Sequence, residues 1–225
     1  MKQKTSSQEL LEKFCLDNSL QLKPVPRSSK PGRKTPDYIL ALHRRKVIVE
    51  VKQFDPNPED RARLQRLRNH GSTGVISNEP GHRIRGKIED ARPQIKQRSI
   101  CRKSAVLVLY DNTGLLIGEL DPHHVLNAMY GEETVNFFVD ETNEAQPIYW
   151  WHRFGGKRKV SPRYNTTLSA IAILLEVNES LEMDFYHNDF AARPFNPDWL
   201  RIPPVRHFRL GGVASRGGLM EWNEI

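Results

Sequence analysis

The chain has 225 residues, of which 38% are hydrophobic and 27% charged, the balance of an ordinary globular protein that can bury a core. No apolar run approaches the roughly 20 residues that span a bilayer, and the opening sequence MKQKTSSQELLEKF lacks the apolar stretch of an export signal. Cys15 and Cys101 lie far apart, without the paired spacing of a zinc site, and indicate reduced thiols. We therefore expect a cytoplasmic protein without a membrane segment.

The formal net charge of +7 is concentrated in one part of the chain. Residues 60–103 hold 12 Lys and Arg against 4 Asp and Glu, so the rest of the chain is close to neutral. Clustered positive charge is the usual electrostatic sign of a protein that binds phosphate backbones. A surface tuned for solubility and a contact with an acidic protein are the two alternatives.

The first predicted element is a helix from Ser6 or Ser7, as its cap, to about Asn18. Its apolar face is formed by Leu10, Leu11, Phe14 and Cys15. Glu9 and Glu12 lie one turn apart, off that face. A short alternating run at residues 20–25 then predicts the first strand of a sheet.

The next segment, residues 35–53 with the sequence TPDYILALHRRKVIVEVKQ, predicts a β-hairpin. Two runs rich in β-branched residues flank a basic turn at residues 43–46. Because strand side chains alternate faces, Glu50 and Lys52 share one face, and Asp37 would join them from the start of the first strand. Two carboxylates and one ammonium would then meet at one end of the sheet. The same charges also suit the solvated polar face of an ordinary hairpin.

Pro36-Asp37 followed by Glu50-Val51-Lys52 resembles the motif of the PD-(D/E)xK nuclease superfamily, the restriction-endonuclease-like enzymes. The resemblance implies that Asp37, Glu50 and the backbone carbonyl of Val51 hold Mg²⁺ or Mn²⁺. It also implies that Lys52 orients the attacking water or neutralises charge at the scissile phosphate.

The resemblance further implies contributions from two helices. An acidic residue on the first helix often completes the metal site of such enzymes, and we choose Glu9, with Glu12 as the alternative. A Gln or Lys on the helix after the motif strand often lies near the metal or the phosphate, and Gln94 is the matching position. Each of these residues also suits an ordinary surface position.

A basic helix is predicted after the hairpin, because Asn57 and Pro58 form a helix start and arginines follow on several sides to about Asn69. A glycine-containing segment, residues 71–86, follows and could close over a substrate. The expected nucleic-acid contacts are Arg61, Arg63, Arg66, Arg68, Arg83, Arg85 and Lys87.

The next helix is marked by the spacing of Ile84, Ile88, Ala91 and Ile95, with a kink or a restart expected near residues 90–93. The apolar run at residues 105–110 predicts a strand buried on both faces. This order of elements is the αβββαβ order of the resembled nuclease core, with the basic helix as an insertion. We therefore predict an α/β fold with a central mixed sheet flanked by helices, a nuclease-like core at residues 1–112 and a C-terminal α+β extension at residues 113–225.

The second half of the chain predicts further elements but no further motif. We expect a helix at 122–130, strands at 134–140 and 147–154, a buried helix at 168–177, an edge strand at 181–186 and a loosely packed tail from 193. The pair His123-His124 and the run His187-Asn188-Asp189 have no partners at a ligand-like spacing and are interpreted as incidental.

The functional hypothesis is a nuclease that requires Mg²⁺ or Mn²⁺ and cleaves DNA in preference to RNA. A homodimer or a protein partner is compatible with it, because one active site cuts one strand. The alternative hypothesis is a non-catalytic nucleic-acid-binding or interaction protein on the same fold. A basic protein–protein module, with the motif present by chance, is the third.

Overall fold

The structure is a computed structural model that describes residues 4–26, 28–29, 32, 34–42, 45–71, 79–99, 103–114, 120–140, 143–211 and 221–225. The elements in these ranges are α1 (Ser6–Asp17), β1 (Gln21–Pro24), β2 (Tyr38–Leu42), β3 (Arg45–Phe54), α2 (Pro58–His70), α3 (His82–Ser99), β4 (Ala105–Asp111), α4 (Pro122–Tyr130), β5 (Glu132–Asp140), β6 (Asn143–Gly156), β7 (Ala170–Val177), β8 (Ser180–His187), the 3-10 helix η1 (Pro197–Leu200), β9 (Val205–Leu210) and β10 (Trp222–Glu224).

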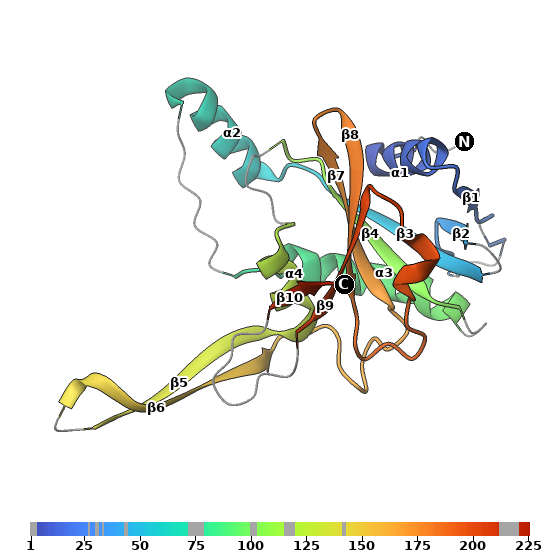
Figure 1. The fold of residues 1–225 in the computed structure, drawn as a ribbon. Coiled ribbons are helices and arrows are strands. Elements are labelled where there is room, and N and C mark those ends of the chain that lie inside the picture. The colour runs from blue at the N-terminus through green and yellow to red at the C-terminus, as the bar shows by residue number, and fades with distance from the viewer. Residues whose placement is uncertain are drawn as a thin grey trace.

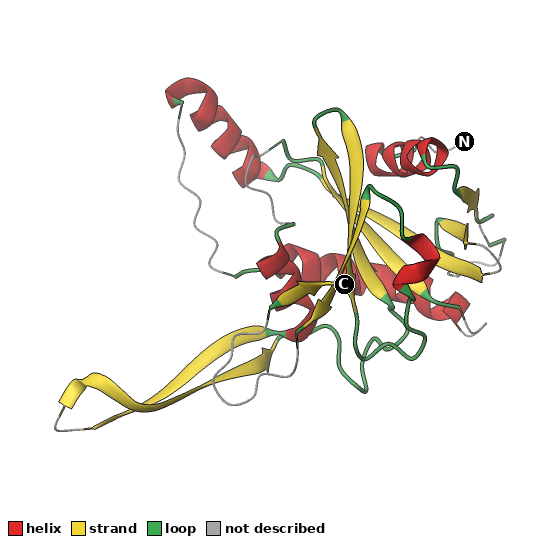
Figure 2. Cartoon of the chain, in the orientation of Figure 1, coloured by secondary structure: helices red, strands yellow, loops and turns green. Residues whose placement is uncertain are grey.

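A mixed sheet of eight strands, in the order β1-β2-β3-β4-β7-β8-β9-β10, forms the centre of the molecule (Figure 1). The pairs β3–β4, β4–β7 and β8–β9 are parallel, and the other neighbours are antiparallel. Helix α1 covers one face of this sheet, whereas α3 and α4 cover the other (Figure 2). The architecture is therefore α/β, with helices on both faces of a large mixed sheet, and the sheet continues through both halves of the chain.

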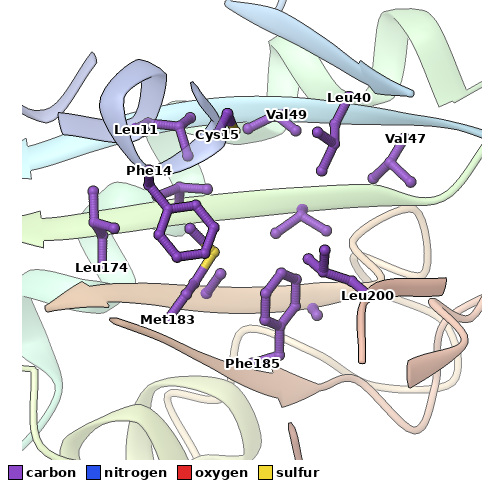
Figure 3. Close-up of a cluster of buried hydrophobic side chains, with 14 of the residues drawn as sticks. Leu11, Phe14, Cys15, Leu40, Val47, Val49, Leu174, Met183, Phe185 and Leu200 are labelled. Atoms are coloured by element: carbon purple, nitrogen blue, oxygen red, sulfur yellow. The ribbon is translucent and has the colours of Figure 1, made fainter. Parts of the chain in front are cut away.

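Each face of the sheet packs into its own hydrophobic core because successive strand residues alternate faces. On one face Leu11 and Phe14 of α1 pack with Val47 and Val49 of β3, and with side chains of β7 and β8 such as Phe185 (Figure 3). The other core is formed by the apolar face of α3 and by α4 against the alternate positions of β3, β4 and β7. Its fully buried members include Ile48, Ile84, Ile88, Leu107, Met129 and Ile171. This second face is also the one that carries Glu50 and Lys52.

Three predictions about secondary structure are wrong. Residues 168–177 do not form a helix, because 170–177 are strand β7 in the centre of the sheet, with residues 170–174 buried on both faces. The strand at 180–187 is not an edge strand, because β9 continues the sheet beyond it. Residues 195–205 of the predicted tail are not loosely packed, because Phe195, Leu200 and Val205 are buried in the first core.

Two details of the predicted helices also differ. Thr5, rather than Ser6 or Ser7, precedes α1 as its N-cap residue, and the side chain of Gln8 accepts a hydrogen bond from Thr5 N. Helix α3 continues without interruption through Pro93, so the restart, one of the two outcomes that the sequence predicts, does not occur there. No helix in the described ranges is both long and apolar enough to cross a membrane.

Strands β5 and β6 form a separate two-stranded ribbon that projects from the body of the molecule (Figure 1). The chain leaves the body at Gly131 and returns at Gly156. A side chain at Gly131, where φ is +102°, would meet the carbonyl oxygen of Gly156 at 2.6 Å, so only glycine fits this close approach. Lys157 Nζ lies 3.1 Å from carboxylate oxygens of both Glu79 and Glu132. These ion pairs connect the base of the ribbon to the residues just before α3.

A pair of buried histidines joins β8 to β9. His187 Nε2 lies 3.1 Å from His207 Nδ1, and His207 Nε2 lies 3.2 Å from the carbonyl oxygen of Leu200. Phe185 and Phe195 pack against the two rings. Burial, reinforced by His207 and Arg209, lowers the pKa of His187 to about 3.

We expect this low pKa of His187 to destabilise the protein in acid. The unfolded chain binds a proton at His187 below about pH 6.5, whereas the folded chain does so only near pH 3, so folding stability is lost as pH falls through this window. The free energy of unfolding should fall by up to about 1.4 kcal/mol per pH unit from this residue. Denaturant unfolding at pH 7, 6 and 5 measures the effect. His187→Gln, which keeps a donor toward His207, should flatten the pH dependence, and an unchanged slope in that variant would contradict the assignment.

Candidate active site

The β2–β3 hairpin brings together the three charged residues of the sequence motif. Tyr38 pairs with Val49 across the antiparallel ladder, so Asp37 lies opposite Glu50. Asp37 N donates a hydrogen bond to Glu50 Oε2 at 3.2 Å, and Lys52 Nζ donates to Glu50 Oε1 at 2.7 Å. Asp37, Glu50 and Lys52 therefore form one connected cluster at the start of β2, as the alternation of the strands predicted.

The carboxylate of Asp37 is held from two directions. Its Oδ2 accepts a hydrogen bond from Val51 N, and its Oδ1 accepts one from Gln8 Nε2, each at 2.9 Å. In an extended strand the N–H and C=O of one residue point to the same side. Because Val51 N points toward Asp37, the carbonyl of Val51 points to that side as well.

Glu50 is buried, with 2% of its surface exposed. Burial raises the pKa of its carboxyl group, and the negative charge of Asp37 raises it further, while Lys52 opposes both effects. The resulting pKa is about 7. At neutral pH this carboxyl group is therefore divided between its protonated and ionised forms, and a neighbouring cation would favour the ionised form.

The arrangement suits a hard divalent cation. Asp37 and Glu50 provide carboxylate oxygens, each with lone pairs beyond those used in the hydrogen bonds above, and the carbonyl of Val51 adds a third oxygen. A divalent charge would also offset the repulsion between the two acids. No group of three or more His, Cys, Asp and Glu side chains suited to a metal occurs in the described part of the chain. The protein ligands offered here are thus two carboxylates and one backbone oxygen.

The α1 residue that reaches this cluster is Gln8, not the expected acid Glu9. Glu9 is exposed, and its side chain has no hydrogen bond or ion pair with any described residue. Glu12 is engaged elsewhere, because it accepts a hydrogen bond from the Tyr38 hydroxyl at 2.9 Å and pairs with Lys4. Gln8 was missed because it lies beside the apolar face of α1 and carries no charge. Its proximity to Thr5, as the third residue of a capping box, is its only sequence signal.

Two other glutamines, Gln53 of β3 and Gln94 of α3, belong to elements that form or flank the predicted site. Gln53 Oε1 accepts a hydrogen bond from Ser7 N at 3.2 Å and so fixes the start of α1 to β3. Gln94 lies on α3, the helix that packs on β3, and is partly buried. Its Oε1 is buried without a hydrogen-bond partner among the described residues, and no hydrogen bond joins it to Asp37 or Glu50. Gln94 therefore remains a predicted site residue, and its side-chain oxygen can still accept a hydrogen bond.

The residues predicted to bind nucleic acid fall into two groups. The side chains of Arg61, Arg66 and Arg68 of α2 are exposed and have no hydrogen bond or ion pair with any described residue. The other four interact within the protein: Arg63 with Glu59, Arg83 with Asp60, Arg85 with Glu79 and Glu132, and Lys87 with the Phe54 ring.

Arg85 differs most from its predicted role. It is 4% exposed, and its Nη1 donates a hydrogen bond to the carbonyl oxygen of Pro80 at 3.0 Å. A side chain buried in this way at the base of the β5–β6 ribbon supports the structure and cannot contact a phosphate on the surface.

The chain was also compared with protein-family models, with curated proteins and with solved structures. None of the three comparisons found a match.

Proposed function

We propose that this protein is a metal-dependent nuclease that hydrolyses phosphodiester bonds, with DNA as its preferred substrate. The observation that carries the proposal is the cluster of Asp37, Glu50 and Lys52 at the end of the β2–β3 hairpin. The negative charge of Asp37 opposes ionisation of the buried Glu50 carboxyl group, which is unfavourable for a purely structural group. A bound cation would relieve this repulsion.

The proposal includes the fold. The segment from α1 through β1, β2, β3 and α3 to β4 is proposed as a restriction-endonuclease-like core, with α2 inserted after the motif strand and the remaining strands as an extension. Its support is the order of elements together with the position of the acids at the end of the hairpin. The basic surface of α2, a short distance along the chain from Lys52, supports a polyanionic substrate.

In the proposed reaction, Asp37, Glu50 and the Val51 carbonyl would hold Mg²⁺ or Mn²⁺. When bound, such an ion polarises the phosphate and lowers the pKa of a bound water. Lys52, at 21% side-chain exposure, lies beside Glu50 and can present its ammonium to a phosphate oxygen, where it would stabilise the charge that develops in the transition state. Gln8 and Val51 N hold the Asp37 carboxylate in place for the cation.

The test is cleavage of plasmid, linear duplex, single-stranded DNA and RNA, each with Mg²⁺, with Mn²⁺ and with a chelator. Lys52→Ala should lower the cleavage rate by at least about 10²-fold, because the ammonium that stabilises the transition state is removed. The variant should still bind metal when measured at pH 8.5, because an alkaline pH favours the ionised form of Glu50 after Lys52, which lowers its pKa, is removed. Wild-type cleavage by Lys52→Ala would refute the proposed role.

One observation favours the non-catalytic alternative. Lys52 and Glu50 satisfy each other in an ion pair, and Asp37 is satisfied by Gln8 and Val51 N, so the cluster is internally paired. Binding of nucleic acid without cleavage of any of the four substrates would establish this alternative.

A further inference from the structure

Helix α2 is fixed firmly at its first turn. Asn57 Oδ1 accepts a hydrogen bond from Asp60 N at 2.8 Å, and Asp60 Oδ2 accepts one from Asn57 N at 3.0 Å. Arg83 of α3 donates to the same Asp60 oxygen at 2.9 Å and to the carbonyl oxygen of Asp55 at 3.0 Å. Asp60 is the buried residue of this helix. The start of α2 is therefore clamped to the end of β3 and to α3.

The rest of α2 extends away from the sheet, toward the upper left of Figure 1. No described helix or strand packs along its length, and its two leucines, Leu64 and Leu67, belong to neither hydrophobic core. The helix ends at Gly71, which adopts φ +69°, the left-handed conformation that favours glycine in a C-cap. Most residues of α2 are therefore exposed and available for contact with a partner.

The exposed surface of α2 has a definite order around the helix axis. At about 100° per residue, Arg61 and Arg68 lie about 20° apart on one flank, and Arg66 lies about 140° from Arg61 on the other flank. All three are exposed and unpaired within the described residues. The surface between the two flanks carries Ala62, Gln65 and Asn69, all exposed.

We propose that α2 is a groove-binding helix for duplex DNA, an inference that rests on the proposed function. The major groove, about 12 Å wide, admits one α-helix between two phosphate backbones. Arg61 and Arg68 would contact the phosphates of one strand and Arg66 those of the other. Gln65 and Asn69 would face the base edges, where amide side chains pair with adenine. The Gln65 side chain donates to Asn69 Oδ1 at 3.2 Å, which holds the two amides side by side.

The position of α2 relative to the active site supports the same occupant. Asn57 follows Lys52 by five residues, a separation of at most about 18 Å even in a fully extended chain. One turn of a DNA duplex is about 34 Å long. A duplex whose scissile phosphate lies at Lys52 can therefore also reach α2 within its next turn. A single strand fits less well, because single-strand sites depend on aromatic stacking and the exposed surface of α2 has no aromatic ring apart from His70.

Binding measurements in the Lys52→Ala background test this inference without cleavage. The probes are a 24-base-pair DNA duplex and one of its strands alone, titrated over a series of salt concentrations. The test variant carries Arg61→Ala, Arg66→Ala and Arg68→Ala. The matched control carries Arg158→Ala, Arg163→Ala and Arg193→Ala, three exposed residues outside α2.

The α2 variant should bind the duplex at least about 10-fold more weakly, and its salt slope should fall by about 0.9 for each phosphate that an arginine no longer neutralises. The control variant should lose less affinity for the duplex than the α2 variant does. The α2 variant should in turn lose less affinity for the single strand than for the duplex. Equal decreases in the α2 and control variants, or equal decreases on both probes, would overturn the inference in favour of general charge attraction. Alanine is a strong helix former, so α2 itself should be preserved.

A second variant, Gln65→Ala with Asn69→Ala, tests the reading of base edges. Selection of bound sequences from a random duplex library should yield a base preference with the parent protein that is absent from this variant, while the salt slope stays unchanged. An unchanged base preference in this variant would show that Gln65 and Asn69 do not contact the base edges. Failure of the proposed function gives a different result: the wild-type protein would cleave nothing, whereas these binding differences would persist.

Discussion

Asp37→Ala is expected to abolish cleavage, with a decrease of at least about 10³-fold, and to abolish metal binding as well. The carboxylate of Asp37 is one of the two that the cluster offers to a cation, and its removal leaves Glu50 as the single acidic ligand. Two measurements are needed: the cleavage rate of the preferred substrate, and the rise in melting temperature on addition of Mn²⁺, which reports metal binding without reference to activity.

Asp37→Asn separates the charge of this residue from its structural role. The amide oxygen of Asn can still accept the hydrogen bond from Val51 N, so the hairpin should keep its geometry while the metal site has one negative charge fewer. The hydrogen bond from Gln8 Nε2 is lost, because the amide nitrogen of Asn is a donor. Asp17→Asn, at an exposed position at the end of α1, is the matched control and should behave as wild type. Wild-type cleavage by Asp37→Ala or by Asp37→Asn would refute the proposed site.

Glu50→Gln is expected to stop cleavage and, at alkaline pH, to stabilise the fold. The folded protein holds the pKa of Glu50 at about 7, above the value of about 4.5 for an unburied glutamate, so the folded state binds this proton more tightly than the unfolded state. The resulting stabilisation is complete below about pH 4.5 and is lost as pH rises through 7. Above pH 7 the ionised, buried carboxylate destabilises the protein.

The neutral amide of Gln removes this penalty but leaves Lys52 without its partner. We therefore expect the free energy of unfolding at pH 8.5 to exceed that of wild type by about 2 kcal/mol, and the difference to shrink toward pH 5. Mn²⁺ should raise the melting temperature of wild type and leave that of Glu50→Gln unchanged.

Glu9→Gln provides the matched control for this experiment, since Glu9 is exposed and unpaired within the described residues. It should alter neither stability nor the response to Mn²⁺. A Glu50→Gln variant that is less stable than wild type at pH 8.5, or that still responds to Mn²⁺, would contradict the pKa and the metal-ligand role of Glu50. Absence of the Mn²⁺ response in Glu9→Gln would restore Glu9 as a ligand.

The hairpin and the position of its charged residues could be predicted from the sequence, because both depend on the alternation of side chains along two strands that are adjacent in the chain. The period of two in β2 and β3 fixes which side chains share a face, and the register follows from the short turn between the strands. The four core positions of α3 were predicted in the same way, from their helical spacing. In each case the residues that set the pattern are close neighbours in the chain.

The errors arise where the local pattern is ambiguous or where distant segments decide the outcome. The continuous apolar run of β7 suits a helix and a strand equally well, and its burial between β4 and β8 makes it a strand. The turn at Asn178 and Glu179, both with positive φ, lacks the glycine that usually marks such a hairpin. Arg85 has the sequence surroundings of a surface cation, and only the packing of Glu79 and Glu132 around it shows that it is buried.

The close approach of Gly131 and Gly156 allows the β5–β6 ribbon to vary in length without a change in the rest of the fold. The β5–β6 ribbon leaves the body and returns to it at adjacent points, so it is a hairpin insertion between α4 and the segment that leads to β7. Insertions whose two ends lie together are the kind that a fold acquires or discards most readily, because the flanking elements need not move. The ribbon can therefore lengthen, shorten or disappear during evolution while β3 and β4, and with them the acidic cluster, keep their places.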